Sequence, residues 1–245
     1  MVAAISSSLR NRQHLLIQQL ADCIEHNWAK YLTLSTYQIP PDLGYIEGSL
    51  EGEKLIIENR CYQTPQFRKL HLELAKVGDR LDILHCVMFP RSNYDIPIFG
   101  VDLVGTQAGI GAAIVDLSPT NSNRILSNTY IQALSNLPTI DFAQPRILPA
   151  WGDIFSPFCL FIRPVDQREE LLFLNRVTQF LTIHCLQAIA STPLLSPQAQ
   201  AEIKAAQLYY CQKQQQNDKT RKVLEKSLGQ IWTDHYMKQM LFDCD

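Results

Sequence analysis

Residues 67–90, FRKLHLELAKVGDRLDILHCVMFP, carry the strongest structural pattern in the chain. In its first half, leucines at every second position alternate with His71, Glu73 and Ala75. This is the period of a β-strand, whose successive side chains point to opposite faces. The second half, LDILHCVMFP, repeats the pattern around His85. Both halves therefore place titratable groups inside apolar strands, where a polar side chain must be paired or used in function.

A short connection sets the register of these two strands. Residues 78–80, Gly-Asp-Arg, have the composition of a hairpin loop. Closing the hairpin there pairs Val77 with Leu81 and places Glu73 opposite His85. Directly opposed residues lie close together on one face of a sheet, so the two side chains are predicted to be neighbours.

A third strand, PIFGVDLVG, extends this arrangement. Pro90 and Pro97 bracket the next loop, because proline ends a ladder rather than continuing it. Pairing these prolines sets His85 opposite Asp102. The result is a polar row of Glu73, His85 and Asp102 across three strands, and a slip of one residue in either hairpin would separate its members.

The segments before and after these three strands predict further strands and helices. An apolar stripe predicts a helix from about residue 12 to 31. The turn EGE at 51–53 predicts another hairpin between GYIEGSL and KLIIENRCYQ. GIGAAIVDLSP is one more strand, a short helix is expected near 130–137, and FCLFIRP at 158–164 has the composition of a fully buried strand.

The last third of the chain is predicted to be helical. Asp166 followed by Glu169 is a capping-box pattern before a long helix. Ser196 followed by Pro197 starts another, with proline at the first helical position. This helix is expected to run without interruption to Gly229, a residue suited to ending it. The segment IWTDHYMKQMLF supplies a final helix.

These elements predict a single domain over residues 1–245 of the α/β class. A mainly antiparallel sheet with two apolar faces needs helices on both sides, so we expect a three-layer α/β/α sandwich. The length of 245 residues, with 46% hydrophobic and 19% charged residues, is sufficient for a sizeable core.

The composition also argues against several classes of function. The net charge of -2 is unlike that of a general nucleic-acid binder, and no apolar run approaches a membrane span. The beginning of the chain does not resemble a signal peptide. Seven dispersed cysteines without a CxxC pair are typical of reduced thiols in the cytoplasm. We find no metal-ligand set, phosphate loop or flavin motif in the sequence.

The polar row has two interpretations. In the first, His85 and Asp102 form a satisfied core pair and Glu73 is exposed at a sheet edge. In the second, the row lines a cleft in which a carboxyl group and an imidazole share and deliver protons. Small residues on the nearby strands describe a cavity floor better than a packed core: Gly100, Gly109 and Gly111.

A second polar cluster surrounds the run QQQNDKTRK. Asn217, Lys219 and Arg221 suit either a solvated helix surface or a clamp for carboxylates. Arg146 is a further candidate for carboxylate binding, because a guanidinium can donate two parallel hydrogen bonds.

Several long segments together carry a family resemblance. LGYIEGSLEGEKLIIENRCYQTPQFRKLHLELAKVG, LDILHCVMFP, AAIVDLSPT, PAWGDIFSPFCLFIRP and QQQNDKTRKVLEKSLG resemble the ferredoxin-dependent bilin reductases of cyanobacteria. The similarity runs from about residue 18 to 242. It implies the same α/β/α sandwich, with the bilin between the sheet and the C-terminal helices.

The resemblance also implies a reaction. It is the four-electron reduction of biliverdin IXα to phycocyanobilin, with single electrons from reduced ferredoxin, radical intermediates and the D-ring vinyl reduced first. The family enzyme binds no metal or flavin of its own. We expect a monomer that contacts ferredoxin transiently and binds neither nucleic acid nor membranes.

Residue roles follow from the same resemblance. Asp102 with His85 would protonate the pyrrole and lactam region of the bilin, and Glu73 would protonate the D-ring vinyl. Other positions are implied in substrate binding, through a hydrogen-bond network or through the propionates: His71, Arg146, Asn217 and Lys219. Two positions depart from the family pattern, since Val101 stands where cysteine is expected and Gly111 where serine is expected.

Two alternatives remain open at this stage. A sister reductase would make another bilin isomer, and a non-catalytic carrier would bind biliverdin without reducing it. Docking of an acidic ferredoxin would use basic residues near the bilin edge, for which the candidates are Arg68, Lys69, Lys76, Arg80, Lys213 and Lys222.

Overall fold

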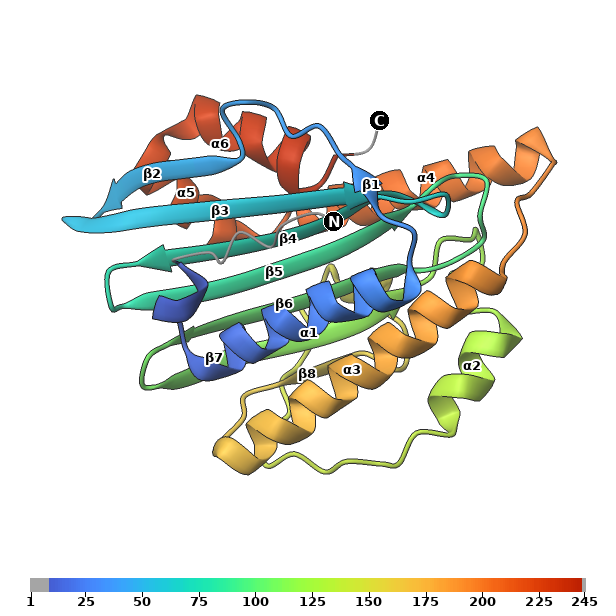
Figure 1. The fold of residues 1–245 in the computed structure, drawn as a ribbon, viewed down its shortest axis with the longest axis horizontal. Coiled ribbons are helices and arrows are strands. Elements are labelled where there is room, and N and C mark those ends of the chain that lie inside the picture. The colour runs from blue at the N-terminus through green and yellow to red at the C-terminus, as the bar shows by residue number, and fades with distance from the viewer. Residues whose placement is uncertain (1–8, 244–245) are drawn as a thin grey trace.

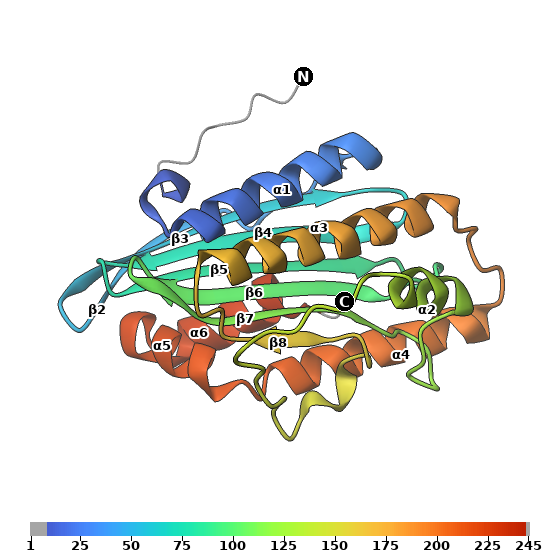
Figure 2. The same ribbon diagram turned by 90° about the horizontal axis from the view of Figure 1, so that it is seen from below.

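The computed structural model describes residues 9–243, with the side chains of residues 218 and 219 left aside. A broad antiparallel sheet lies between two layers of helices, as expected (Figure 1). Figure 2 shows α1 and α3 over one face of the sheet and α4, α5 and α6 over the other. The chain is therefore an α/β/α sandwich.

The sheet contains eight strands within residues 9–243, and their order is β1-β3-β4-β5-β6-β7-β8, with β2 also pairing with β3. Neighbours on this path are mostly consecutive in the chain, so short hairpins set most of the pairings. The strands are β1 (Ser35–Thr36), β2 (Tyr45–Leu50), β3 (Glu53–Gln63), β4 (Phe67–Val77), β5 (Leu81–Pro90), β6 (Ile98–Thr106), β7 (Gly109–Ser118) and β8 (Leu160–Ile162).

The helices flank this sheet. The α-helices are α1 (Leu15–Tyr31), α2 (Asn128–Ser135), α3 (Gln167–Ala190), α4 (Pro197–Gln214), α5 (Asp218–Leu228) and α6 (Gln230–Tyr236). Three short helical segments complete the description: η1 (Arg10–Arg12), η2 (Gly152–Ile154) and the π-helical η3 (Met237–Leu241).

The predicted register of the central strands is confirmed. Val77 pairs with Leu81, Glu73 with His85, and His85 with Asp102. Residues of the other parity, such as Leu84, point into the core beneath α1 and α3. The polar row thus lies on the face covered by the C-terminal helices, which we call the site face.

Helix capping follows the sequence in part, since Glu169 accepts from the N–H groups of Ala143 and Val165 and not from that of Asp166. Asp166 accepts a hydrogen bond from the backbone N–H of Glu169, and Ser196 caps α4 in the same way. Gly229 has a φ of 84°, a left-handed conformation that glycine adopts without strain, and it separates α5 from α6.

Three boundaries differ from the prediction. The helix expected to continue to Gly229 breaks at residues 215–217, because this glutamine-rich run offers no apolar stripe to pack. The strand expected at 158–164 shrinks to the half-buried β8, since a turn from Ser156 to Cys159 uses its first residues. The first helix begins at Leu15, after the 3₁₀ turn η1.

A cluster of charges holds the end of the chain on the sheet. The ammonium of Lys69 on β4 is fully buried and donates to the Met240 carbonyl at 2.7 Å and to Asp243 Oδ2 at 2.9 Å. Arg68 donates to Asp243 Oδ1 at 2.7 Å. The two basic residues therefore bind the C-terminal segment from neighbouring positions of one strand. Lys69 is not available for docking a partner.

Lys76 is likewise unavailable, since it is buried against Asp82 at 2.9 Å. The docking role suggested by the sequence for Lys69 and Lys76 is wrong, because both ammonium groups are inside the protein. Alternation in a strand does not distinguish a buried lysine with a partner from an exposed one.

We expect Lys69→Met to lower the free energy of unfolding by roughly 3 kcal/mol, because it leaves Asp243 and the Met240 carbonyl short of a buried donor. Urea unfolding measures the loss, and faster amide exchange within η3 would locate it. The exposed Lys30→Met on α1 is the matched control. Equal stability of the two variants would contradict the role of Lys69.

Candidate functional site

The polar row is continuous across three neighbouring strands. His85 Nδ1 lies 2.5 Å from Asp102 Oδ1. Glu73 and His85 are 6% and 8% exposed, whereas the side chain of Asp102 is 40% exposed. The placement of Glu73 at an exposed sheet edge, which belonged to the first interpretation, is wrong, because β4 has neighbours on both sides. The row runs from the buried interior to an accessible carboxylate.

Two residues that the sequence argument missed bind the buried end of the row. The Tyr236 hydroxyl is hydrogen-bonded to Glu73 Oε2, and it lies 3.0 Å from Asn59 Oδ1. The same Asn59 oxygen lies 2.7 Å from His71 Nε2. Glu73 is thus tied to His71 through a phenol and an amide rather than directly.

Burial and charge shift the acidities of this group in different directions. Burial raises the pKa of Glu73, and the charge of His85 and the hydrogen bond from Tyr236 offset this only in part. Burial acts to lower the pKa of His85, but the charge and hydrogen bond of Asp102 outweigh it and the pKa is raised. Burial, with the charge of Lys69, holds the pKa of His71 well below its usual range.

The arrangement can therefore store protons near neutrality. A carboxyl with a raised pKa tends to keep its proton, and an imidazole with a raised pKa tends to gain one. His85 Nε2 is buried and has no hydrogen-bond partner among residues 9–243. A protonated imidazole would present that N–H to a ligand as a donor.

The His85–Asp102 pair predicts a pH-dependent stability. Since the folded-state pKa of His85 is raised, its stabilising contribution is full below the ordinary histidine pKa of about 6.5 and is lost as the pH rises through the folded value. We expect Asp102→Asn to lower the free energy of unfolding by about 1 kcal/mol near pH 6. This figure is small because solvent screens the partly exposed Asp102 carboxylate. Urea unfolding at about pH 6 and about pH 9 measures this, and a gap that widens at high pH would contradict it.

An apolar floor surrounds the exposed end of the row. On the site face, Ile83 pairs with Val104, and Asp102 pairs with Ile114. Val104 is 38% exposed, and Ile83 and Ile114 are half-buried. A flat ligand lying on this floor would contact the Asp102 carboxylate directly.

The three glycines that were predicted to form the cavity floor lie in different surroundings. A Cβ on Gly100 would lie 3.2 Å from the Tyr210 hydroxyl, so the floor approaches α4 closely there. Gly109 begins β7 at the tight turn opposite Thr106, so its predicted place in the cavity floor is wrong. Gly111 lies at the register shift in β7, exposed, with its carbonyl accepting from Arg146 Nη1 at 2.8 Å.

The remaining binding candidates lie apart from the row. The Arg146 guanidinium is stacked over the Phe161 ring at 5.3 Å, beside the β7–β8 border. Asn217 is half-buried in the link between α4 and α5. The side chain of Lys219 lies outside the described residues. Val101, one of the two departures from the family pattern, points into the core beneath α1 and α3, away from the site face.

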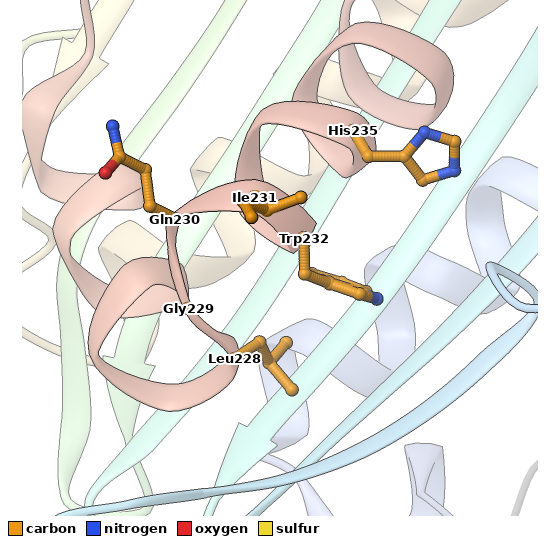
Figure 3. Close-up of a pocket in the computed structure, with 6 residues that line it drawn as sticks. All are labelled: Leu228, Gly229, Gln230, Ile231, Trp232 and His235. Atoms are coloured by element: carbon orange, nitrogen blue, oxygen red, sulfur yellow. The ribbon is translucent and has the colours of Figure 1, made fainter.

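A depression of about 680 Å³ lies at the corner between α5 and α6 (Figure 3). Trp232 contributes to it and also stacks on Tyr236, with ring centroids 4.8 Å apart. The depression is apolar and is not the polar row itself. Its lining consists of Leu228, Gly229, Gln230, Ile231, Trp232 and His235.

Among residues 9–243, no cluster of three or more His, Cys, Asp or Glu side chains could hold a metal ion. None of the helices there has both the length and the apolar character needed to cross a bilayer.

Comparison with known proteins gives consistent results. A family model described as ferredoxin-dependent bilin reductase matches residues 21–243. The chain is 58% identical over 232 residues to the phycocyanobilin:ferredoxin oxidoreductase of Trichodesmium erythraeum, covering 95% of this chain and 94% of that protein. It is 57% identical over 244 residues to the protein of the same name from Synechococcus elongatus, covering 99% and 98%.

Among solved structures, the chain resembles the crystal structure of phytochromobilin synthase from tomato, determined in complex with biliverdin. The TM-score is 0.75 at 16% identity, over 92% of this chain and 82% of that one. At this level of identity the likeness concerns the fold alone. It agrees with the three layers described above.

Proposed function

The chain belongs to the ferredoxin-dependent bilin reductase family, and from this we propose that it reduces biliverdin IXα to phycocyanobilin. Relatives at 57% and 58% identity carry the name of that activity. The reaction consumes four electrons, which ferredoxin supplies one at a time, and four protons. The protein must therefore bind the pigment flat and provide protons at defined atoms.

One observation carries the proposal: Glu73, His85 and Asp102 lie side by side on one face of three paired strands. We propose that a single planar molecule inserted between this face and the C-terminal helices contacts all three. General acids contribute most when their pKa lies near the operating pH, and burial raises the pKa of Glu73 in that direction.

The three side chains take different roles. We assign Asp102 and His85 to protonation of the pyrrole and lactam region, because they share a short hydrogen bond and Asp102 is accessible. Glu73 would supply the proton to the D-ring vinyl, which is reduced first. Each one-electron reduction makes the pigment more basic, so a nearby acid prevents charge from accumulating in an apolar site.

The propionates of the pigment need cations. Arg146 is exposed and lies beside the apolar floor, stacked over Phe161. A guanidinium binds a carboxylate through two parallel hydrogen bonds. We propose that Arg146 binds one propionate, with Asn217 and Lys219 completing the clamp from the start of α5.

Ferredoxin would dock through the basic residues that remain exposed. Arg80 and Lys222 are on the surface, whereas Arg68 is held by Asp243. We expect Arg80→Glu and Lys222→Glu together to reduce kcat/KM for ferredoxin roughly tenfold at low salt, and much less at high salt. Lys30→Glu on α1 is the control for charge alone. A loss that is independent of salt would contradict steering by these residues.

Product chromatography tests the function itself. Protein, biliverdin IXα, ferredoxin and a ferredoxin-reducing system should yield phycocyanobilin, and omission of ferredoxin should abolish the yield. A product that stops after two electrons would identify a sister reductase with another bilin product. A shifted pigment spectrum without reduction would identify a non-catalytic carrier.

We place the reaction in the cytoplasm and expect a monomer. Cys23, Cys61, Cys86, Cys159 and Cys185 are free thiols, as is typical of a reducing compartment. Gel filtration coupled to light scattering would reveal a dimer if the second expectation is wrong.

A further inference from the structure

Glu73 is held from the opposite layer by a phenol. Tyr236 on α6 is fully buried, and its hydroxyl contacts Glu73 Oε2 and lies 3.0 Å from Asn59 Oδ1. Its ring is stacked between the sheet and Trp232. The hydroxyl therefore has two oxygen neighbours and little freedom to find others.

Asn59 is fixed as an acceptor. Its Nδ2 donates to the Leu43 carbonyl at 2.8 Å, which leaves Oδ1 facing Tyr236 and His71. Because a carbonyl oxygen only accepts, His71 must donate through Nε2. The burial that lowers the pKa of His71 favours its neutral form, with that single N–H.

A phenol carries a single proton and can donate it to one acceptor at a time. The two acceptors here differ, since the amide of Asn59 is always neutral whereas Glu73 gains a negative charge when it gives up its proton. Hydrogen bonds to ionised acceptors are roughly twice as strong as those to neutral ones. The preferred acceptor of Tyr236 therefore depends on the state of Glu73.

We propose that Tyr236 is a positioning residue for Glu73: its hydroxyl donates to Asn59 while Glu73 is protonated and turns to Glu73 Oε2 as the carboxylate forms. The phenol keeps its own proton in both states. Burial holds the pKa of Tyr236 well above its usual range, which agrees with this role.

This inference rests on the proposed function for its catalytic meaning. If Glu73 protonates the pigment, negative charge develops on its carboxylate during the transfer. A donor that strengthens as this charge appears stabilises the transition state more than the ground state. Tyr236 would lower the barrier in this way, and Asn59 would hold the hydroxyl when the carboxyl is neutral.

Substitutions at the two positions should act in opposite directions. Tyr236→Phe removes the donor to the carboxylate, so the pKa of Glu73 rises further. Asn59→Leu removes the competing acceptor, so the hydroxyl donates permanently to Glu73 and its pKa falls. A merely structural role would not produce shifts of opposite sign.

Neither substitution changes a charge. Tyr236→Phe therefore leaves the other titratable groups that face Glu73 with their own partners, whereas Asn59→Leu also removes the acceptor of His71 Nε2. These groups come from β3, β4, β5, β6 and the C-terminal segment: Cys61, Lys69, His71, His85, Asp102 and Asp243.

Infrared titration of the protein without pigment measures the effect. The carbonyl band of protonated Glu73 is identified by its loss in Glu73→Gln. We expect the band to persist to higher pH in Tyr236→Phe than in the wild type, and to vanish at lower pH in Asn59→Leu. Tyr130→Phe, which removes a buried hydroxyl bonded to His184 beneath α3, should leave the band unchanged.

An unmoved band in Tyr236→Phe, or shifts of the same sign in both substitutions, would overturn the proposal. Tyr236→Phe preserves the ring, so the test does not depend on whether Asn59→Leu folds. With biliverdin and reduced ferredoxin, Tyr236→Phe should lower turnover about tenfold and move the pH profile upward. If the infrared shifts appear but the wild type reduces no pigment, the proposed function fails and the hydrogen-bond switch stands.

Discussion

Asp102→Asn is expected to bind biliverdin normally and to form almost no phycocyanobilin. Asparagine preserves the size of the side chain at the exposed end of the polar row, but it cannot share a proton with His85. General acid–base groups contribute roughly 10²–10⁴-fold to rates. We therefore expect product formation to fall by about 10³-fold, and the pigment to accumulate as a radical after the first electron.

Stopped-flow absorption spectra and electron spin resonance under anaerobic reduction would detect this radical, and chromatography would quantify the product. Asp95→Asn is the matched control, because it removes the same charge from an exposed carboxyl in the loop before β6. A normal yield of phycocyanobilin from Asp102→Asn would contradict the assigned role.

A double substitution tests whether His85 and Asp102 act as one unit. Two groups that share a proton titrate together. Once one of the two side chains has been substituted, substituting the other should therefore lower the rate only slightly more, as for other catalytic groups that act jointly. We expect His85→Gln combined with Asp102→Asn to be about as slow as the slower single variant. Multiplicative losses would indicate independent roles.

Glu73→Gln is expected to have the second large effect. Glutamine fits the buried position but has no proton to give, so the D-ring vinyl should remain unreduced. We expect at least a roughly 10²-fold loss of phycocyanobilin, with any slow product retaining that vinyl group. Mass spectrometry and the absorption of the extracted pigment distinguish the two outcomes.

The same substitution should not destabilise the protein near neutral pH. Because burial raises the pKa of Glu73, ionisation of this carboxyl opposes folding as the pH rises. A neutral glutamine removes that effect while keeping an oxygen for Tyr236. Urea unfolding should therefore give an equal or higher stability for Glu73→Gln above pH 7, and the loss of activity could not be attributed to unfolding.

Glu170→Gln is the control for this experiment. Glu170 lies on α3, on the other side of the sheet, and the substitution likewise replaces a carboxyl group by an amide. We expect wild-type product from it. Reduction of the D-ring vinyl by Glu73→Gln at the normal rate would assign that proton to another donor.

The central part of the fold was predictable because its connections are short. The loop at residues 78–80 and the prolines at 90 and 97 leave one sensible register, and every residue of the polar row follows from it. The α/β/α layers follow as well, since apolar residues occupy both faces of β4 and β5.

The partners of Glu73 were not predictable in the same way. Asn59 shares the alternation of β3 and pairs directly with Glu73, so the register of the β3–β4 hairpin implies this contact. Tyr236 lies 163 residues away along the chain from Glu73. Its contact with Glu73 depends on how α6 packs against the sheet, and the local hydrophobic pattern of the sequence does not predict that packing.

The buried lysines show a similar limit. Lys69 shares the strand parity of His71 and Glu73, and Lys76 shares that of the leucines, yet each has its carboxylate inside the protein. For Lys69 that partner is Asp243, which is distant in sequence. Burial of a charge is decided by such a partner, so composition near the lysine does not reveal it.

The C-terminal closure of the site face has a consequence for synthesis in the cell. Strands β3 to β7 are complete long before the ribosome reaches α4, while Asp243 follows α4, α5, α6 and η3. Until then Lys69 and the apolar residues that pack beneath the C-terminal helices, such as Val87 and Phe89, remain uncovered on the nascent chain. A chain that is released after the ribosome stalls within α5 would have a complete sheet with the apolar surface of its site face exposed. Such a chain would be bound by chaperones or degraded by proteases.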